Sequence, residues 1–483
     1  MEGGRCGMPA VFWLPGAYLM KPSRGGLIGL ITLGCDKNTV DMEYIAGALE
    51  SAGLRWRTLD AENPPDGQDL DAVVVLTCGF VQDARKQSVE ALVHWAEHKK
   101  HSGAPLILAA AGCLSQRYGN DLAAELPELD LICGVGNPQG LAARLKTLLD
   151  TRECRKAHQP AVPELPAERP VLCWTGGTRR RAPLSASPSA SLKISDGCDH
   201  HCAFCAIPMI KGPHRSVPRN ILLAEARALL HRGARELVLV AQDTTAYGRD
   251  LYSDYGLPEL LADLDALPGA FWIRILYAYP TGIRPRLLDA MASLRHVAPY
   301  LDLPFQHLDP EVLRRMRRPL RAADPETVLS RLRRAIPGIT LRTTFIVGHP
   351  GESRQAFARL MRGIETLQFN WVGAFAWSPE EDTDSARQDG RPTPRTVRRR
   401  IERIMTRQAD ITAAWNAERV GGVEEVLIES VDPASGIAAG RTVREAPEVD
   451  GAVYLRAQDC APGQVRPARI LRASVYDLEA EPL

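Results

Sequence analysis

The sequence has no excess of charge of either sign, since 59 lysines and arginines stand against 58 aspartates and glutamates. Proteins that coat nucleic acid are usually more basic, so the overall charge disfavours that class. The sequence also lacks a run of about 20 apolar residues, the length that spans a bilayer. The apolar stretch MPAVFWLPGAYLM near the N-terminus is shorter, contains Pro9 and Pro15, and lacks the layout of a signal peptide. We therefore expect a soluble, cytoplasmic protein with no membrane segment.

The cysteines do not form a disulfide framework. There are eleven of them, an odd number scattered over 483 residues, which is not the pattern of a small secreted protein. In a reducing cytosol such cysteines are mostly buried, metal-bound or catalytic. For any single one, a small buried hydrophobic side chain is the default interpretation.

The N-terminal part of the chain has the pattern of a parallel sheet. We interpret residues 1–25 as a disordered extension, or as the result of an early start codon with Met20 as the true beginning. Over residues 26–150, apolar runs alternate with helical patterns, which is typical of a parallel sheet with helices on both faces. The predicted strands are Gly26–Leu33, Asp71–Thr77, Pro105–Ala111 and Asp130–Val135, and the predicted helices include Lys37–Ala52, Ala84–Lys100 and Pro138–Leu149.

Three further segments follow. Residues 151–190 are rich in Pro, Ser and Ala and have the composition of a linker. Residues 191–418 contain six strand–helix units, which predict a partial barrel of parallel strands with its site at their carboxyl ends. Residues 419–483 contain short β-like runs between Gly, Pro and Asp turns, which predict a small all-β barrel. The strands predicted in the central segment are Leu192–Ser195, Glu236–Ala241, Trp272–Ala278, Tyr300–Pro304, Thr340–Val347 and Trp371–Trp377, and those in the tail are Glu424–Ile428, Ala452–Leu455 and Arg466–Leu471.

The strongest motif is Cys198-x-x-x-Cys202-x-x-Cys205, which follows the strand LKIS. Three thiolates on one loop can hold a [4Fe–4S] cluster and leave its fourth iron open. A structural zinc site more often uses four ligands in paired C-x-x-C units. We call these three cysteines the central set. Their spacing, with Phe204 before the last cysteine, resembles the signature of the radical S-adenosylmethionine superfamily, in which the open iron chelates S-adenosylmethionine.

A second group, which we call the N-terminal set, consists of Cys35, Cys78 and Cys113. Each follows a different predicted strand and precedes a helix, so the three should converge at one edge of the sheet. Helix N-termini lower the pKa of a thiol, which favours metal binding. Three buried thiols are the alternative interpretation, but three equivalent positions favour a second cluster. The remaining cysteines are interpreted as structural or incidental, with Cys133 also near a strand end: Cys6, Cys133, Cys154, Cys173 and Cys460.

Local sequences extend the resemblance from about residue 26 to the end of the chain, except for the linker. ITLGCDKNTVDME, LTCGFV and AAGCLSQRY resemble the N-terminal domain of the methylthiotransferases, KISDGCDHHCAFCAIP resembles their central domain, and the tail resembles a TRAM domain. One group in this family modifies adenosine in transfer RNA, and the other (RimO type) modifies an aspartate of the small-subunit ribosomal protein twelve. VAQDTTAYG, YLDLPFQH, LRTTFIVGHPGE and REAPEVDGAVY are similar to the second group.

Two differences from the transfer-RNA group support the resemblance to the RimO type, and at two other positions the chain differs from the usual family sequence. The transfer-RNA group usually has a GQN-type segment where this chain has Ala241-Gln242-Asp243, and a serine where it has His307. Members of this family usually have phenylalanine at the position of His349. We expect the histidine to change the cofactor pocket or the pH at which that pocket titrates. The segment HRSVPRN also departs from a common Arg-Ser-Arg pattern.

The resemblance implies two [4Fe–4S] clusters and S-adenosylmethionine as cofactors. The central set would reduce and cleave S-adenosylmethionine, and the resulting radical would remove hydrogen from the β-carbon of the aspartate. The N-terminal set would supply the sulfur, methylated by a second S-adenosylmethionine. We expect an unidentified electron donor and sulfur source, with no requirement for nucleic acid. Further cofactor contacts are expected at strand ends: Gln242, Asp243, Gln306, Arg342 and the turn Gly348–Glu352, with Phe204 beside the adenine.

Charge in the tail favours a basic protein over RNA as the substrate. From Arg419 to Leu483 there are seven arginines and eleven acidic residues, a net charge of −4. We expect Glu445, Glu448 and Asp450 to help bind a basic ribosomal protein, with ordinary surface charge as the competing interpretation. Methylthiolation of adenosine in transfer RNA is the nearest competing function. A non-catalytic zinc or cluster scaffold that binds RNA, and an iron–sulfur electron carrier, are more distant competing functions.

Overall fold

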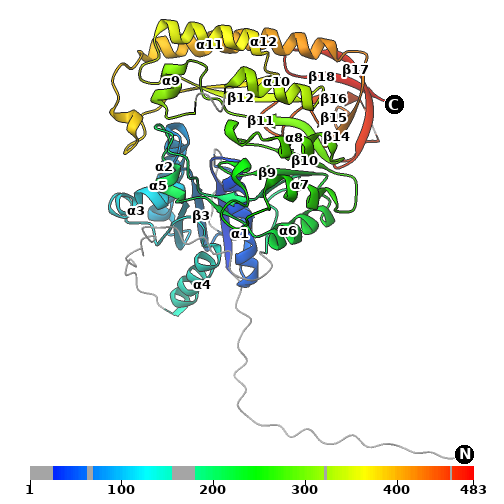
Figure 1. Ribbon diagram of the computed structural model, residues 1–483. Helices are drawn as coiled ribbons and strands as arrows, with labels where there is room; N and C mark the ends of the chain where they lie inside the picture. The colour runs from blue at the N-terminus through cyan, green and yellow to red at the C-terminus, as the bar shows by residue number, and fades with distance from the viewer. Residues whose placement is uncertain (1–25, 62–68, 155–179, 320–323, 457–458) are drawn as a thin grey trace, which may run out of the picture.

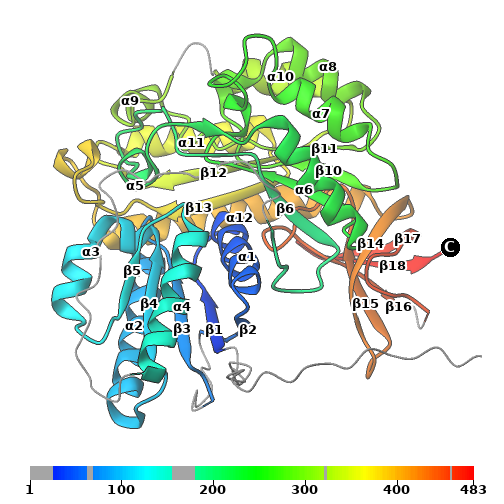
Figure 2. The same cartoon turned by 90° about the horizontal axis from the view of Figure 1, so that it is seen from below.

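The computed structural model describes residues 26–61, 69–154, 180–319, 324–456 and 459–483. Three parts follow one another along the chain, and the N-terminal and C-terminal parts lie on different sides of the central one (Figures 1 and 2). The predicted extension and most of the predicted linker fall outside the described residues. Within the described ranges, no helix is both long and apolar enough to cross a membrane.

The N-terminal part is the expected parallel sheet with helices on both faces. Its five strands have the order β2-β1-β3-β4-β5. Helices α1 and α4 cover one face through Met42, Leu49 and Leu145, while α2 and α3 cover the other. The unpredicted edge strand β2 reads RWRT, and it lacks the apolar run that identified the others. The elements are β1 (Leu27–Thr32), α1 (Asp36–Ser51), β2 (Arg55–Thr58), β3 (Ala72–Thr77), α2 (Gln82–Ser102), β4 (Ile107–Gly112), α3 (Cys113–Glu125), β5 (Leu131–Cys133) and α4 (Pro138–Cys154).

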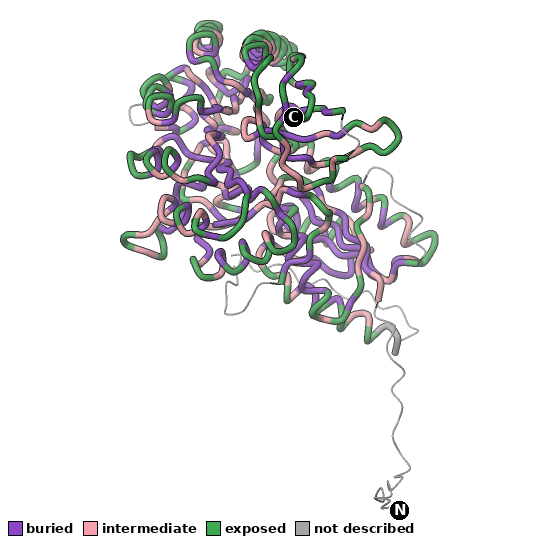
Figure 3. Tube along the Cα trace, turned by 90° about the vertical axis from the view of Figure 1, so that its right-hand side faces the viewer, coloured by how far each residue is buried: buried purple, intermediate pink, exposed green. Residues whose placement is uncertain are grey.

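The central part contains six parallel strands in sequence order, β6-β9-β10-β11-β12-β13, as predicted for a partial barrel. One face packs against the helices through alternate apolar residues such as Leu239, Ile275 and Leu341. Buried residues follow the strands, and exposed residues follow the outer helices (Figure 3). The strands and first helices are β6 (Ser189–Lys193), β7 (Ser195–Asp196), α5 (Ile207–Lys211), β8 (Arg215–Ser216), α6 (Arg219–His231), β9 (Glu236–Val240), η1 (Thr244–Ala246), α7 (Leu257–Asp265) and β10 (Trp272–Ile275). They are followed by η2 (Pro280–Gly282), α8 (Pro285–Ser293), β11 (Val297–Asp302), α9 (Pro310–Arg315), α10 (Pro325–Ala335), β12 (Thr340–Val347), α11 (Arg354–Leu367), β13 (Trp371–Ala376), η3 (Asp384–Arg387) and α12 (Pro394–Glu418).

The C-terminal part is a closed five-stranded barrel in the order β14-β15-β16-β18-β17, which confirms the predicted all-β class. Val426, Ile428, Leu455 and Ile470 fill its core. Strands β15 and β18 were not predicted, because Gly440 interrupts the first and exposed glutamates alternate in the second. The strands are β14 (Val423–Asp432), β15 (Ile437–Arg441), β16 (Val453–Arg456), β17 (Val465–Ala473) and β18 (Leu478–Pro482).

The connection between β15 and β16, residues 442–452, packs on the face of the central sheet opposite the helices. Ala446 joins Val238, Val240 and Tyr300 in one buried cluster. The indole N–H of Trp371 donates to the Arg444 carbonyl at 3.0 Å. The small barrel is therefore anchored to the central sheet by its own loop.

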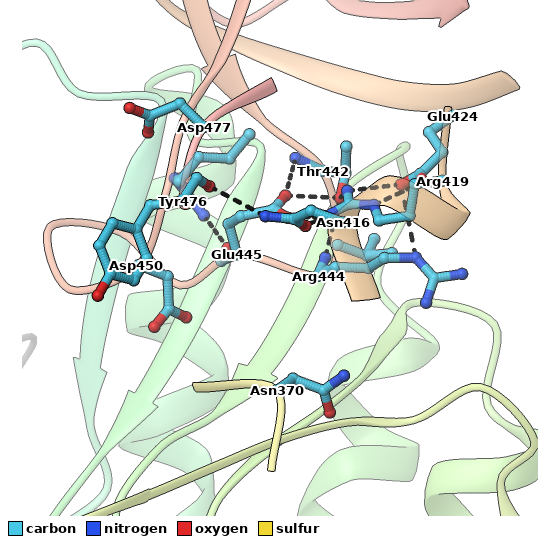
Figure 4. Close-up of polar contacts among 12 residues, drawn as sticks. Asn370, Asn416, Arg419, Glu424, Thr442, Arg444, Glu445, Asp450, Tyr476 and Asp477 are labelled. Atoms are coloured by element: carbon cyan, nitrogen blue, oxygen red, sulfur yellow. Dashed lines mark hydrogen bonds and ion pairs between the residues drawn. The ribbon is translucent and has the colours of Figure 1, made fainter. Parts of the chain in front are cut away.

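This anchoring overturns the expected role of two acidic residues. Glu445 is 1% exposed and accepts hydrogen bonds from Arg419 at 2.6 Å and from Thr442 (Figure 4). The Asp450 side chain is also 1% exposed and pairs with Arg342, and the Tyr300 hydroxyl donates to it at 2.6 Å. Both carboxylates lie inside the molecule because they satisfy buried donors. The prediction that they face a substrate protein is therefore wrong.

Asp450 generates a prediction about pH. Burial raises its pKa to about 6, above its ordinary value, although Arg342 opposes the shift. A group whose pKa is higher in the folded state stabilises the fold increasingly as the pH falls through that value. Asp450→Asn should therefore keep or raise the melting temperature at about pH 7.5, where the charged form destabilises the fold by on the order of 3 kcal/mol. It should also flatten the pH dependence of melting between about pH 6 and 4.

The control is Asp459→Asn, which changes an exposed carboxylate of the same barrel and should leave the melting curve unaltered at every pH. A large loss of stability for Asp450→Asn at about pH 7.5 would show that the ion pair with Arg342 outweighs the burial of the charge.

Candidate functional site

The central set lies on a loop that several backbone contacts hold in place. Gly197 precedes it with a φ of +72°, and a Cβ there would approach the Pro213 carbonyl oxygen to 2.1 Å, so only glycine fits. The backbone N–H of Cys198 donates to the Gly212 carbonyl at 3.1 Å. In the middle of the loop, the N–H of Ala203 donates to the Met316 carbonyl at 2.9 Å, which ties the loop to the end of α9.

The N-terminal set follows three adjacent strands, β1, β3 and β4. Cys35 is the N-cap of α1, and Cys113 is the first residue of α3. Two glycines allow the loops to approach one another. A Cβ on Gly34 would lie 3.2 Å from the Cys78 sulfur, and one on Gly79 would lie 2.7 Å from the Cys113 carbonyl.

The expectation that helix N-termini lower the pKa of these thiols is wrong for the buried ones. Burial raises the pKa of Cys113 to about 12 and also raises that of Cys78, which backbone N–H groups of the following loop only partly oppose. In the central set, burial raises the pKa of Cys198 to about 11 and that of Cys205 to about 12. A metal site needs thiolates, so these sulfurs depend on a bound cation to lose their protons.

The two sets lie on facing surfaces of neighbouring domains. Cys113 packs in one buried cluster with Val135, Ala206 and Ile210, and Ala206 directly follows Cys205. Cys133 instead packs beneath α1 and α4. Among the described residues, no three His, Cys, Asp or Glu side chains converge on a single metal ion. The ligands of a four-iron cluster each bind a different iron, so they need not converge in that way.

A buried group of charges joins the two domains beside the cysteines. Asp41 on α1 pairs with Lys193 on β6 and, at 3.2 Å, with Lys211 on α5. Asp196 pairs with both lysines, at 3.1 and 3.3 Å. Burial alone would raise the pKa of Asp196, but the two lysines outweigh it and lower that pKa. We call these four residues the interface charge group. Sequence reasoning missed it, although a lysine inside the apolar strand LKIS was a signal.

A second contact between the domains lies next to Cys35. The Tyr277 hydroxyl donates to Asp36 at 3.1 Å, and the Lys37 ammonium lies 3.1 Å from the centre of the Tyr277 ring. Tyr277 adopts a left-handed φ of +58°. Such strain is retained where the surrounding structure requires it, often at functional sites.

Two predicted cofactor contacts have polar atoms without a partner. The side-chain oxygens of Gln242 and Gln306 are buried and accept no hydrogen bond in the described structure. Gln306 also has a φ of +72°. Buried polar atoms are normally satisfied, so these two oxygens fit acceptors for a bound molecule. Phe204 packs beside Met316 and Ile346 at the same end of the sheet.

The other predicted contacts are already engaged within the protein. Asp243 accepts from Thr245 and pairs with His200 at 2.7 Å. Arg342 lies near the start of β12 rather than at its carboxyl end, and it pairs with Asp302 and Asp450. The expectation that it is a strand-end residue is therefore wrong.

The turn from Gly348 to Glu352 closes on itself. The N–H of Gly348 donates to the Glu352 carboxylate, which also pairs with Arg400 at 2.7 Å. His349 is fully buried, and its Nε2 lies 2.7 Å from the Ser385 hydroxyl. Burial lowers the pKa of His349 to about 4, so the ring is neutral at physiological pH. The N–H of Ser385 donates to the Ala203 carbonyl at 2.8 Å. Through Ser385, His349 therefore supports the loop of the central set, and it does not introduce a group that changes its protonation near neutral pH.

The chain is similar to known proteins along almost its whole length. Family models match residues 28–134 (uncharacterized protein family UPF0004), 192–364 (radical SAM superfamily) and 420–483 (TRAM domain). The ribosomal protein uS12 methylthiotransferase RimO of Desulforudis audaxviator is 40% identical over 94% of this chain and 97% of its own. The chain belongs to the RimO family of methylthiotransferases. The corresponding protein of Moorella thermoacetica is also 40% identical, over 94% of this chain and 99% of its own.

Membership in the RimO family makes this protein a radical S-adenosylmethionine methylthiotransferase, which sets aside both the RNA-binding scaffold and the electron carrier. Two solved structures share the fold. The radical S-adenosylmethionine methyltransferase TsrM from Kitasatospora setae has a TM-score of 0.52 at 15% identity, covering 73% of this chain and 75% of its own. The cobalamin-dependent radical enzyme OxsB has a TM-score of 0.53 at 14% identity, covering 75% and 54%.

Gly79 tests the architecture of the N-terminal set. Gly79→Ala places a methyl group against the Cys113 backbone, so the loops of Cys78 and Cys113 must separate. After anaerobic reconstitution, the variant should lose at least about half of the iron bound by this set. The control is Gly53→Ala, where a Cβ meets nothing within 4 Å but φ is +78°. It should lose about 1 kcal/mol of stability and no iron. Full iron in Gly79→Ala would contradict the close approach of the loops.

Proposed function

We propose that this protein adds a methylthio group to the β-carbon of an aspartate in ribosomal protein uS12, using two [4Fe–4S] clusters and S-adenosylmethionine. The observation that carries the proposal is that Cys113 shares one buried cluster with Ala206, which directly follows Cys205. It brings the two sets to one interface, so a sulfur donor and a radical source can serve the same substrate atom. The names of the 40% identical relatives support the reaction and the substrate.

In this proposal, Cys198, Cys202 and Cys205 hold the cluster that binds S-adenosylmethionine. When bound, this cofactor pair supplies the one-electron chemistry that removes hydrogen from an unactivated carbon, which no side-chain base could do at neutral pH. The unpartnered oxygens of Gln242 and Gln306 would accept hydrogen bonds from S-adenosylmethionine, and Phe204 would lie beside the adenine. Asp243 would act indirectly, because it holds His200.

Cys35, Cys78 and Cys113 would hold the second cluster, which would supply the sulfur to be transferred. The interface charge group keeps this set against the central domain, since Asp196 alone balances the charge of only one of the two lysines and Asp41 on α1 balances the other. Burial of Cys78 and Cys113 keeps water from their sulfurs. The chain's own part in sulfur transfer is therefore to hold and shield this set.

The surface charge of the C-terminal barrel supports a protein substrate, even when the buried Glu445 and Asp450 are left out of the count. Among the described residues of the C-terminal barrel, six carboxylates are exposed against three arginines, so the surface remains acidic and complements a basic ribosomal protein. The exposed residues are Glu425, Asp432, Glu448, Asp459, Glu479 and Glu481, against Arg456, Arg469 and Arg472. We propose a cytoplasmic location, where ribosomal proteins are assembled, and no requirement for nucleic acid.

Mass spectrometry distinguishes the two substrates of this family. The reconstituted enzyme is incubated with S-adenosylmethionine, a one-electron reductant and sulfide, together with either uS12 or unmodified transfer RNA. We expect a methylthio mass gain on an aspartate of uS12 alone, because the exposed barrel surface favours a basic protein. A gain on adenosine would keep the site assignments and refute the proposed substrate.

Iron content tests the two-cluster assignment. Replacing the central set or the N-terminal set with alanines should each reduce bound iron from roughly eight atoms per chain to roughly four, since each set holds one four-iron cluster. Colorimetric iron and sulfide analysis measures this directly. Cys460→Ala, a cysteine in the C-terminal barrel, is the control and should retain all the iron. Loss of all iron from both triple variants would contradict independent clusters.

A further inference from the structure

Arg318 lies directly against a cysteine of the central set. Its guanidinium donates to the Cys202 sulfur at 3.8 Å and also to the Pro304 carbonyl. The residue is 9% exposed. A buried cation directed at a metal-ligand sulfur needs an explanation beyond packing.

A stack of rings holds this guanidinium in position. The guanidinium lies 4.1 Å from the centre of the Tyr279 ring. His200 stacks on the same ring with centroids 3.6 Å apart and planes 10° apart. His200 is in turn held by Asp243 at 2.7 Å. A cation on an aromatic face is stabilised most where water is excluded, and Tyr279 is 8% exposed.

The backbone before Arg318 is also constrained. Arg317 has a left-handed φ of +54°, an uncommon conformation for a residue other than glycine. The preceding residue, Met316, accepts the hydrogen bond from Ala203 in the cysteine loop. The Arg317 side chain points away and pairs with Asp384 at the surface. The strained turn therefore sends one arginine outward and its neighbour toward Cys202.

We propose that Arg318 is a positioning residue that tunes the cluster of the central set through its contact with Cys202. This inference rests on the proposed function, because it requires a cluster at these cysteines. Reduction adds one electron from an external one-electron donor, and the added negative charge is stabilised by a nearby cation and by an N–H hydrogen bond to a ligand sulfur. Arg318 thus makes the cluster easier to reduce, and the Tyr279–His200–Asp243 stack keeps it in place.

The experiment is an anaerobic potentiometric titration of the full-length reconstituted enzyme, with electron paramagnetic resonance as the readout and with the N-terminal set replaced by alanines so that one cluster reports. Arg318→Met should shift the one-electron equilibrium at least tenfold toward the oxidised form, about 59 mV. Arg318→Lys should shift it less, because the charge remains. Tyr279→Leu should shift it in the same direction as Arg318→Met.

Arg317→Met is the matched control, since it removes a neighbouring arginine that does not contact the cysteines, and its titration should match the wild type. If Arg318→Met retains its iron and titrates like the wild type, Arg318 is only structural and the inference is overturned. If that variant loses its iron, the lysine and Tyr279 variants decide, and wild-type potentials in both overturn it. Failure of the wild-type central set to assemble any cluster would instead refute the proposed function.

Discussion

Two lysines and two aspartates buried between the N-terminal and central domains determine how the two sets of cysteines meet. Asp41 comes from α1, whereas Lys193, Asp196 and Lys211 come from the central domain. Asp196 balances only one of the two lysine charges, and an unpaired charge in the interior is strongly destabilising, so the second lysine requires Asp41 and therefore α1 in its observed place. Because α1 begins immediately after Cys35 and α5 lies just after Cys205, this electrostatic requirement also sets the approach of the two sets.

Other contacts between the same domains reinforce that arrangement. The Tyr44 hydroxyl on α1 donates to Glu225 on α6 at 2.8 Å, and Glu380 after β13 accepts from Arg117 on α3 at 3.0 Å. These two contacts join different pairs of elements, so they hold the interface at separate points. They resist rotation of the N-terminal domain, which would change the relation between the cysteine sets. The two clusters of the proposed mechanism thus depend on a rigid interface, not on a flexible tether.

The C-terminal barrel is joined to the catalytic sheet more closely than a separate binding module would be. Arg441 on β15 pairs with Glu236 at the start of β9 at 2.6 Å, and Glu236 also pairs with Arg274. All three side chains are almost fully buried. If the barrel binds the substrate as proposed, its outer face is the part of the described barrel that remains for this contact. Surface charge, rather than the total charge of the segment, is therefore the relevant quantity for recognition.

The sequence could predict the parts of the site that depend on local patterns, but not those that depend on contacts between distant residues. The carboxyl ends of β1, β3 and β4 were recognisable because their strands are continuous apolar runs, and the spacing of the central set is local. Arg318 and Lys211 could not be recognised from the sequence as parts of the site. The residues that they contact there, Cys202 and Asp41, are more than a hundred residues away in the chain. Edge strand β2 also escaped prediction, since a strand at the edge of a sheet need not be apolar on both faces.

The sequence by itself determined the class of the three domains and the six cysteines proposed to hold clusters, because periodicity and short motifs are local properties. Tertiary structure alone decided the direction of the thiol pKa shifts, since burial outweighs the helix N-termini at Cys113. It also decided that Glu445 and Asp450 are internal, because a carboxylate in a polar-looking loop becomes buried when distant arginines and a tyrosine satisfy it. Charge can be counted from a sequence, but its exposure depends on which partners the fold brings together.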